Sequence, residues 1–268
     1  MERIKLNNGE MIPALGFGTW QLKPLGEAYK AVSAALNSGY RHIDTAHIYL
    51  NEGSVGKAIA DSGIDRKEIY LATKLWNWDH KKAEKAYDKS LKKLKLDYVD
   101  LYLIHYPVTG TRIDAWKTLE KMYNEKRMKS IGVSNFTVKH LEELMSKTSV
   151  VPAINQVEFH PFLYQKDLLD FCNKHGIILE AYSPLAHGQR LGNTTLSDLA
   201  KKHDKSVAQI MIRWSLQHGN VVIPKSRDLN RIKQNIDVFD FELSENEMTS
   251  IDALNENFHT CWNPEKTA

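Results

Sequence analysis

One pattern repeats along most of the chain: a short apolar run is followed by a turn and then by an amphipathic stretch. The runs at residues 69–74 and 98–104 show it clearly, and each is followed by apolar residues spaced by three and four, as in a helix. Strands that alternate with helices predict parallel β/α units. Counting residues 15–17 as the first strand gives about eight units. The pattern therefore predicts an α/β fold, a closed (β/α)8 barrel of the TIM type.

The length and the N-terminal segment agree with this fold. The chain has 268 residues, close to the ~250 typical of such a barrel. Residues 4–6 and 11–13, joined by a turn at 7–10, predict a β-hairpin ahead of the barrel. No linker or low-complexity segment interrupts the chain, so we expect residues 1–268 to form a single domain.

Some helix ends carry sequence signals. Ser206 with Gln209 and Ser244 with Glu247 fit the capping box, and Gly219 fits a helix stop. Other polar residues in helix or turn contexts, including His80 and His140, are expected at the surface.

Composition excludes several classes of protein. The net charge of +3 is too small for a dedicated nucleic-acid binder or a membrane-surface protein. No run approaches 18 apolar residues, and the N-terminus lacks the apolar region of a signal peptide. The cysteines, Cys172 and Cys261, form no CxxC pair, which suits a reducing compartment. We expect a cytoplasmic monomer without a membrane or nucleic-acid partner.

Titratable side chains fall at the carboxyl ends of three consecutive predicted strands: Asp44, Tyr49, Lys74 and His105. Active sites of TIM barrels lie at this end, so these side chains should meet. Reduction of a carbonyl needs a hydride donor and an acid. A tyrosine, with a pKa of about 10, becomes a better acid beside a lysine cation. Asp44 would hold Lys74, and His105 would orient the carbonyl oxygen.

Each of these residues also has an ordinary structural interpretation. A single Asp or Lys at a strand end is more often part of a loop salt bridge. A single Tyr in a loop usually packs, and a single His before a proline often only satisfies a hydrogen bond. Spacing alone leaves both interpretations open.

Ordered motifs cover nearly the whole chain, and together they resemble the aldo-keto reductase family. They are GFGTW at 16–20, HIDTA at 42–46 with Tyr49 and NE at 51–52, LATKLW at 71–76, DLYLIH at 100–105, IGVSNF at 131–136, NQVE at 155–158, YSPL at 182–185 and IPKS at 223–226. The resemblance implies that Tyr49 is the general acid, Lys74 the partner that lowers its pKa and Asp44 the anchor of Lys74. It implies that His105 orients the carbonyl.

The resemblance also implies the cofactor NADPH. The family holds the nicotinamide carboxamide with residues that match Ser134, Asn135 and Gln156, and stacks an aromatic that matches Tyr182 on its ring. Lys225, Ser226 and Arg231 match contacts to the 2′-phosphate, and Gln234 and Asn235 match contacts to adenine. The other implied cofactor residues are Gly18, Thr19, Trp20, Asp44, Ser183, Pro184 and Leu185. A solvated helix face is the alternative for the basic cluster, and Arg227 and Asp228 depart from the common family residues.

An aromatic-lined pocket is expected around the carbonyl site, formed by Trp20, Ile48, Tyr49, Trp76, His105 and Tyr106. The loop at 108–113 and the tail after 254 are short, as in the microbial branch that includes the 2,5-diketo-D-gluconate reductases. The tail residues His259, Cys261 and Trp262 would close one side. No HExxH or paired Cys/His array occurs, so no catalytic metal is expected.

The sequence therefore predicts NADPH-dependent reduction of aldehydes, ketones or dicarbonyls to alcohols. Two alternatives stay open. The barrel could bind NADP in a regulatory or structural role, since a fold does not determine function, or the enzyme could serve mainly as an alcohol dehydrogenase.

Overall fold

The computed structural model describes residues 2–266. The strands are β1 (Arg3–Lys5), β2 (Met11–Pro13), β3 (Phe17–Gly18), β4 (His42–Asp44), β5 (Tyr70–Leu75), β6 (Leu101–Ile104), β7 (Ser130–Ser134), β8 (Ile154–Glu158), β9 (Ile178–Tyr182) and β10 (Val221–Val222). The α-helices are α1 (Glu27–Asn37), α2 (Glu52–Asp61), α3 (Ala83–Leu94), α4 (Arg112–Asn124), α5 (Val138–Lys147), α6 (Lys166–Lys174), α7 (Thr194–Lys202), α8 (Val207–Gln217), α9 (Leu229–Asn235) and α10 (Glu245–Asp252). Short 3-10 helices are η1 (His47–Tyr49), η2 (Arg66–Glu68), η3 (Asn77–Lys82), η4 (Ala186–Gly188) and η5 (Pro264–Lys266).

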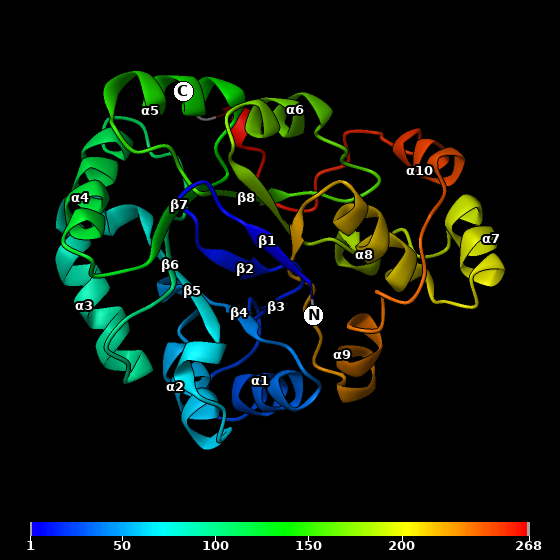
Figure 1. Ribbon diagram of the computed structural model, residues 1–268, viewed down its shortest axis with the longest axis horizontal. Helices are drawn as coiled ribbons and strands as arrows, with labels where there is room; N and C mark the ends of the chain where they lie inside the picture. Colours follow the sequence, from blue (N-terminus) through cyan, green and yellow to red (C-terminus); the bar gives the residue numbers. More distant parts are fainter. Residues whose placement is uncertain (1, 267–268) are drawn as a thin grey trace.

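The strands from β3 to β10 form a parallel sheet in chain order, with helices around the outside (Figure 1). The two ends of the sheet also meet. The backbone N–H of Gly16 donates to the carbonyl oxygen of Val222 at 2.8 Å, and Val222 donates to Ala14 at 2.9 Å. The sheet closes, so the predicted TIM barrel is confirmed. The predicted first strand at 15–17 is displaced: β3 begins at Phe17, and Leu15 forms only a bridge to Val222.

Alternate side chains of each strand point into the barrel or out to the helices. In β6, Leu101 and Leu103 belong to the interior cluster, whereas Tyr102 and Ile104 pack in the cluster shared with the helices. The strands β5 to β8 are buried along their whole length, as expected for a parallel sheet covered by helices.

The predicted hairpin is confirmed as β1 and β2, and it covers the amino ends of the barrel strands (Figure 1). Leu6 and Ile12 pack in the interior cluster. Asn7 Nδ2 donates to the carbonyl oxygen of Pro152, just before β8, at 3.0 Å. Because this end is plugged, the opposite end is the one that can hold a site.

Both predicted capping boxes form, at Ser206 and at Ser244, and Gly219 takes a φ of 80° after α8. The expected surface positions of His80 and His140 are wrong, since both are buried. His140 completes a third capping box at the start of α5, and His80 Nδ1 lies 3.0 Å from a threonine hydroxyl in the next loop. Each imidazole lies within hydrogen-bond distance of a partly buried threonine, which the spacing of residues does not reveal.

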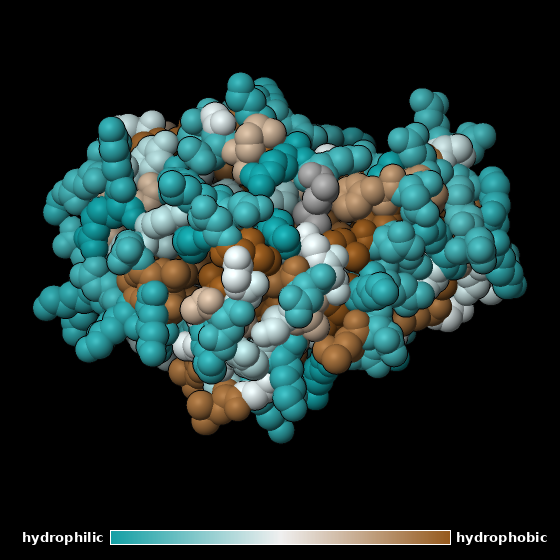
Figure 2. All heavy atoms as spheres, turned by 60° about the horizontal axis from the view of Figure 1, so that its bottom comes forward, coloured by the Kyte–Doolittle hydropathy of each residue, from teal (hydrophilic) through white to brown (hydrophobic). Residues whose placement is uncertain are grey.

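Across residues 2–266, no helix is both long and apolar enough to cross a bilayer. The face in Figure 2 carries mainly hydrophilic residues, with apolar areas interrupted by them.

Candidate active site

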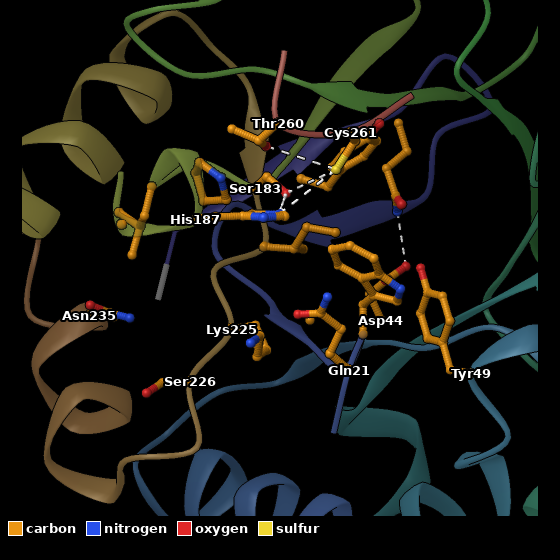
Figure 3. Close-up of a pocket in the computed structure, with 18 of the residues that line it drawn as sticks. Gln21, Asp44, Tyr49, Ser183, His187, Lys225, Ser226, Asn235, Thr260 and Cys261 are labelled. Atoms are coloured by element: carbon orange, nitrogen blue, oxygen red, sulfur yellow. Dashed lines mark hydrogen bonds between the residues drawn. The ribbon is translucent and has the colours of Figure 1, made fainter. Parts of the chain in front are cut away.

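A cavity of about 1350 Å³ opens at the carboxyl ends of the barrel strands. Its lining extends from Tyr49 and Trp76 to Arg231 and Asn235. In Figure 3, Tyr49 and Asn235 lie on opposite sides of the cavity. The cavity is elongated and brings two predicted groups of site residues into a single space. One group lies around Asp44, Tyr49, Lys74 and His105, called the tetrad below, and the other lies near α9.

Lys74 and Asp44 form a buried ion pair beneath this cavity. Lys74 Nζ donates to the two carboxylate oxygens of Asp44 at 2.6 and 2.7 Å, and to the carbonyl oxygen of Thr45 at 2.8 Å. Burial alone would lower the pKa of Lys74, but Asp44 and Tyr49 outweigh it, and the pKa lies above its ordinary value. Lys74 is therefore a cation at neutral pH.

Tyr49 ends η1 and places its hydroxyl 3.4 Å from Lys74 Nζ, on the cavity wall. Burial raises the pKa of Tyr49 to about 12, and Lys74 opposes this rise. We expected Lys74 to make the pKa lower than usual; its effect has the expected sign, but desolvation is larger. Tyr49 is held in the protonated form, which a proton donor needs.

His105 follows β6, and its ring stands edge-on to Tyr49 and to Trp76, with centroid distances of 5.7 and 5.0 Å. Burial lowers the pKa of His105 well below its usual value, and Lys74 adds to the effect. The ring is therefore neutral near pH 7 and carries one N–H donor. Because the rings of His105 and Tyr49 both line the cavity, a substrate oxygen placed between these two rings can accept a hydrogen bond from each.

Polar residues predicted to hold a nicotinamide lie beside this group. Tyr182 Oη donates to Asn135 Oδ1 at 2.8 Å, and Asn135 Nδ2 donates to Ser134 Oγ at 3.0 Å. Asn135 takes a φ of 64°, in the left-handed region that asparagine tolerates better than most residues. Gln156 Nε2 donates to Asp44 Oδ2 at 2.9 Å, which joins these residues to the ion pair.

The far end of the cavity carries the predicted phosphate and adenine contacts. Burial lowers the pKa of Lys225, and Arg231 is exposed at the rim. Arg227 pairs with Glu27 at 3.4 Å, which directs this side chain toward α1. The predicted residues that line this end are Lys225, Ser226, Arg231, Gln234 and Asn235.

The predicted substrate residues gather at the end that holds Tyr49: Trp20, Ile48, Tyr49, Trp76, His105 and Tyr106. Trp20 is 39% exposed and Trp76 only 8%, so Trp20 lies at the mouth. The tail adds Cys261 and Trp262 to the lining, whereas His259 is outside it.

Glu158 holds this tail in place. It ends β8, and its carboxylate accepts from the backbone N–H groups of Thr260 at 2.8 Å and Cys261 at 3.1 Å, and from the Thr260 hydroxyl. Figure 3 shows Thr260 and Cys261 beside Ser183 and His187 above the cavity.

Besides His259, two predicted residues lie outside the lining. Thr19 is fully buried, and its backbone N–H donates to the carbonyl oxygen of Asp44 at 3.0 Å. Lys74 lies below the surface of the cavity and reaches it through Tyr49. The other predicted cofactor residues line it: Gly18, Trp20, Asp44, Ser134, Asn135, Gln156, Tyr182, Ser183, Pro184 and Leu185.

The sequence reasoning missed several residues of the site. Glu180 is fully buried in β9 and accepts from Gln156 at 2.6 Å. A charged residue inside an apolar run was a signal that could have found it. Gln21 and His187 also line the cavity, but exposed polar loop residues give no such signal.

The chain is similar to known proteins along most of its length. Residues 14–256 match the model of the aldo/keto reductase family. The chain is 49% identical over 267 residues to glyoxal reductase of Bacillus subtilis, covering 99% of this chain and 97% of that one. It is 46% identical to methylglyoxal reductase DkgA of Escherichia coli, covering 94% and 93%. A crystal structure of MGS-M4, an aldo-keto reductase enzyme from a Medee basin deep-sea metagenome library, shares 47% identity and a TM-score of 0.95, with full coverage of both chains.

The matched segment begins at Ala14, just before β3, and ends in the loop after α10. It therefore includes every strand of the barrel sheet, β3 to β10. The chain belongs to the aldo/keto reductase family and is an oxidoreductase that reduces carbonyl groups to alcohols.

Proposed function

We propose that this enzyme uses NADPH to reduce small aldehydes, ketones and dicarbonyls, with Tyr49 as the proton donor. One observation carries the proposal: a continuous cavity joins the group formed by Asp44, Tyr49, Lys74 and His105 to a basic end beside α9.

The residues of this cavity fit NADPH. At one end, side-chain amides and hydroxyls suit a carboxamide, and the Tyr182 ring offers a flat face for a nicotinamide. At the other end, Lys225 and Arg231 suit a phosphate. A Cβ at Gly18 would lie 3.0 Å from the carbonyl oxygen of Ile223, so the glycine lets the chain after β10 pass close to β3 in the cavity lining. Bound there, NADPH supplies the hydride.

The chain's own residues handle the proton. Tyr49 donates its hydroxyl proton to the carbonyl oxygen, and the Lys74 cation at 3.4 Å stabilises the phenolate that is left. Asp44 holds Lys74 in place through its carboxylate. The neutral His105 ring donates its N–H to the same oxygen and so orients the carbonyl. General acid catalysis of this kind contributes about 10²- to 10⁴-fold to the rate.

The size and lining of the pocket support small dicarbonyls as substrates. Trp20, Trp76 and Tyr106 give the pocket flat apolar walls, and the loop between β6 and α4 is short and adds only His105 and Tyr106 to the lining. Two relatives are named for glyoxal and methylglyoxal. These features support a place in the short-loop microbial branch with the 2,5-diketo-D-gluconate reductases.

A panel of carbonyl compounds, run with NADPH and NADH side by side, tests the proposal. We expect oxidation of NADPH by glyoxal and methylglyoxal, slower turnover with NADH, and a loss of about 10²- to 10⁴-fold in Tyr49→Phe. Full activity in Tyr49→Phe would contradict the acid role, and equal use of NADH would contradict the cofactor.

We also propose that residues 1–268 act as one domain, as a monomer in the cytoplasm. Cys172 and Cys261 are both free, which supports a reducing compartment. Sedimentation equilibrium tests the monomer, and a dimer at micromolar concentration would contradict it.

A further inference from the structure

Glu180 is a buried carboxyl group for which the proposed reaction has no use. It lies in β9, fully buried, two residues before Tyr182 and therefore on the same face of the strand. Across the sheet its register partner is Gln156. Taking a carboxylate out of water costs several kcal/mol. A buried titratable group beside an active site is a candidate for a functional role.

Glu180 controls the orientation of the Gln156 amide. Gln156 Nε2 donates to Glu180 Oε2 at 2.6 Å and to Asp44 Oδ2 at 2.9 Å. An amide nitrogen has two hydrogens, so both are directed inward and Oε1 is left for the cavity. The opposite orientation would place the amide oxygen against two carboxyl groups. Gln156 therefore presents an acceptor to the cavity.

His42 lies behind Glu180. His42 Nε2 is 3.4 Å from Glu180 Oε1, and neither atom has a hydrogen-bond partner elsewhere among residues 2–266. A Cβ at Gly16 would lie 2.5 Å from His42 Nδ1, so the glycine makes room for the ring. The carboxyl oxygen and the ring nitrogen are therefore close neighbours that form no hydrogen bond in this part of the structure.

We propose that Glu180 is a positioning residue of the active site, which, backed by His42, fixes Gln156 so that its amide oxygen accepts from the carboxamide of the nicotinamide. This inference rests on the proposed use of NADPH. In this proposal the Glu180–His42 pair orients a cofactor contact through Gln156, and the proton on Glu180 affects the charge beside Asp44 and Lys74.

The charges around Glu180 determine where its proton resides. Burial and then Asp44 raise the pKa of Glu180 to about 8, and burial with Lys74 lowers the pKa of His42 to about 3. Near pH 7, Glu180 is thus protonated and faces the neutral His42 ring at 3.4 Å. The groups that face it are His42 and Asp44 from β4 and Lys74 and Tyr70 from β5. On its two neighbouring strands, β8 supplies the neutral Gln156 and β10 only valines.

Two substitutions separate these roles. Glu180→Gln imitates the protonated form: its oxygen can accept from Gln156, and its nitrogen can donate to His42. Glu180→Ala removes both contacts. Glu52→Gln is a matched control, because Glu52 is a buried carboxyl on α2 that contacts Thr73 outside the cavity.

The readouts are the NADPH dissociation constant, from quenching of tryptophan fluorescence, and the pH profile of kcat/KM. We expect Glu180→Gln and Glu52→Gln to bind NADPH within about twofold of the unchanged protein. Glu180→Ala should bind about tenfold more weakly, and adding it to Gln156→Ala should weaken binding no further. In the unchanged protein, kcat/KM should decline near pH 8, where Glu180 loses its proton. Of the two glutamine variants, Glu180→Gln should lack this decline and Glu52→Gln should keep it.

The inference is overturned if Glu180→Ala binds NADPH as tightly as the unchanged protein, or if Glu180→Gln keeps the decline near pH 8. Should Glu180→Ala not fold, the pH profile of Glu180→Gln decides. If the unchanged protein fails to bind NADPH, the proposed function fails and this inference with it. If NADPH binding is unaffected in Glu180→Ala, only this inference fails.

Discussion

Replacement of Lys74 by Met isolates the buried ion pair. Lys74 contributes three short hydrogen bonds, two of them to Asp44, which is 2% exposed. Without the ammonium group, the Gln156 amide at 2.9 Å is the one side-chain donor left to Asp44 among residues 2–266. Breaking a buried pair by removing one partner costs about 3–5 kcal/mol. With a urea slope of about 3 kcal/mol/M, the unfolding midpoint should fall by about 1–1.7 M.

The double variant Lys74→Met with Asp44→Asn provides the matched control. It leaves no unpaired buried charge, so it should regain most of the lost midpoint. Its rate of NADPH oxidation by methylglyoxal should stay about 10²- to 10⁴-fold low, as in Lys74→Met, because Tyr49 lacks its cation in both variants. A single variant as stable as the unchanged protein, or a double variant no more stable than the single one, would refute this reasoning.

Three further predictions concern the helix layer, the tail and the phosphate end. A Cβ at Gly56 would lie 1.9 Å from the carbonyl oxygen of Leu94, so Gly56→Ala should lower the unfolding midpoint despite the ~1 kcal/mol that alanine gains in a helix. The control Gly53→Ala, whose Cβ would have its nearest contact at 3.7 Å, should raise the midpoint. Equal shifts in the two variants would contradict the clash at Gly56. Glu158→Gln should release the tail and raise KM for carbonyl substrates about tenfold, as expected for a lost hydrogen bond to a charged group. The NADPH dissociation constant should not change. An unchanged KM would mean that the tail does not form a wall of the substrate pocket. Arg231→Ala should raise KM for NADPH about tenfold and leave KM for NADH unchanged, and an equal rise for both would exclude a 2′-phosphate contact.

The sequence predicts the barrel and the position of the tetrad because both depend on simple periodicity. Parallel strands bring their carboxyl ends to one edge, so locating the strand ends was enough to bring Asp44, Lys74 and His105 together. Strand limits were off by one to three residues, as for the run 69–74, which becomes β5 (Tyr70–Leu75). Such errors leave a residue on the same edge of the barrel.

The contacts across the barrel could not be predicted in this way. Glu180 and His42 lie on β9 and β4, which are not neighbours, so neither spacing nor register of adjacent strands indicates their contact. The raised pKa of Tyr49 has a similar origin, because desolvation depends on every atom packed around the ring. Sequence reasoning recognises which charges are near a group but underestimates how far water is excluded from it.

The pH dependence of reduction distinguishes two groups that could each cause an alkaline loss of activity. The kcat/KM profile reports groups of the free enzyme. With a pKa of about 12, Tyr49 stays protonated up to pH 10 and cannot itself limit the rate there. Glu180, with a pKa of about 8, loses its proton within this range. The new negative charge favours the Lys74 cation and raises the pKa of Tyr49 further, which weakens the acid without removing its proton.

We therefore expect kcat/KM to fall severalfold around pH 8 and then to reach a plateau. A group that modulates the acid changes the rate between two finite values, whereas loss of the acid's own proton lowers the rate tenfold for each further pH unit. A continuous tenfold decline above pH 8 would mean that Tyr49 itself titrates there. In that case the lysine outweighs desolvation after all, and burial would not be the dominant influence on the catalytic tyrosine.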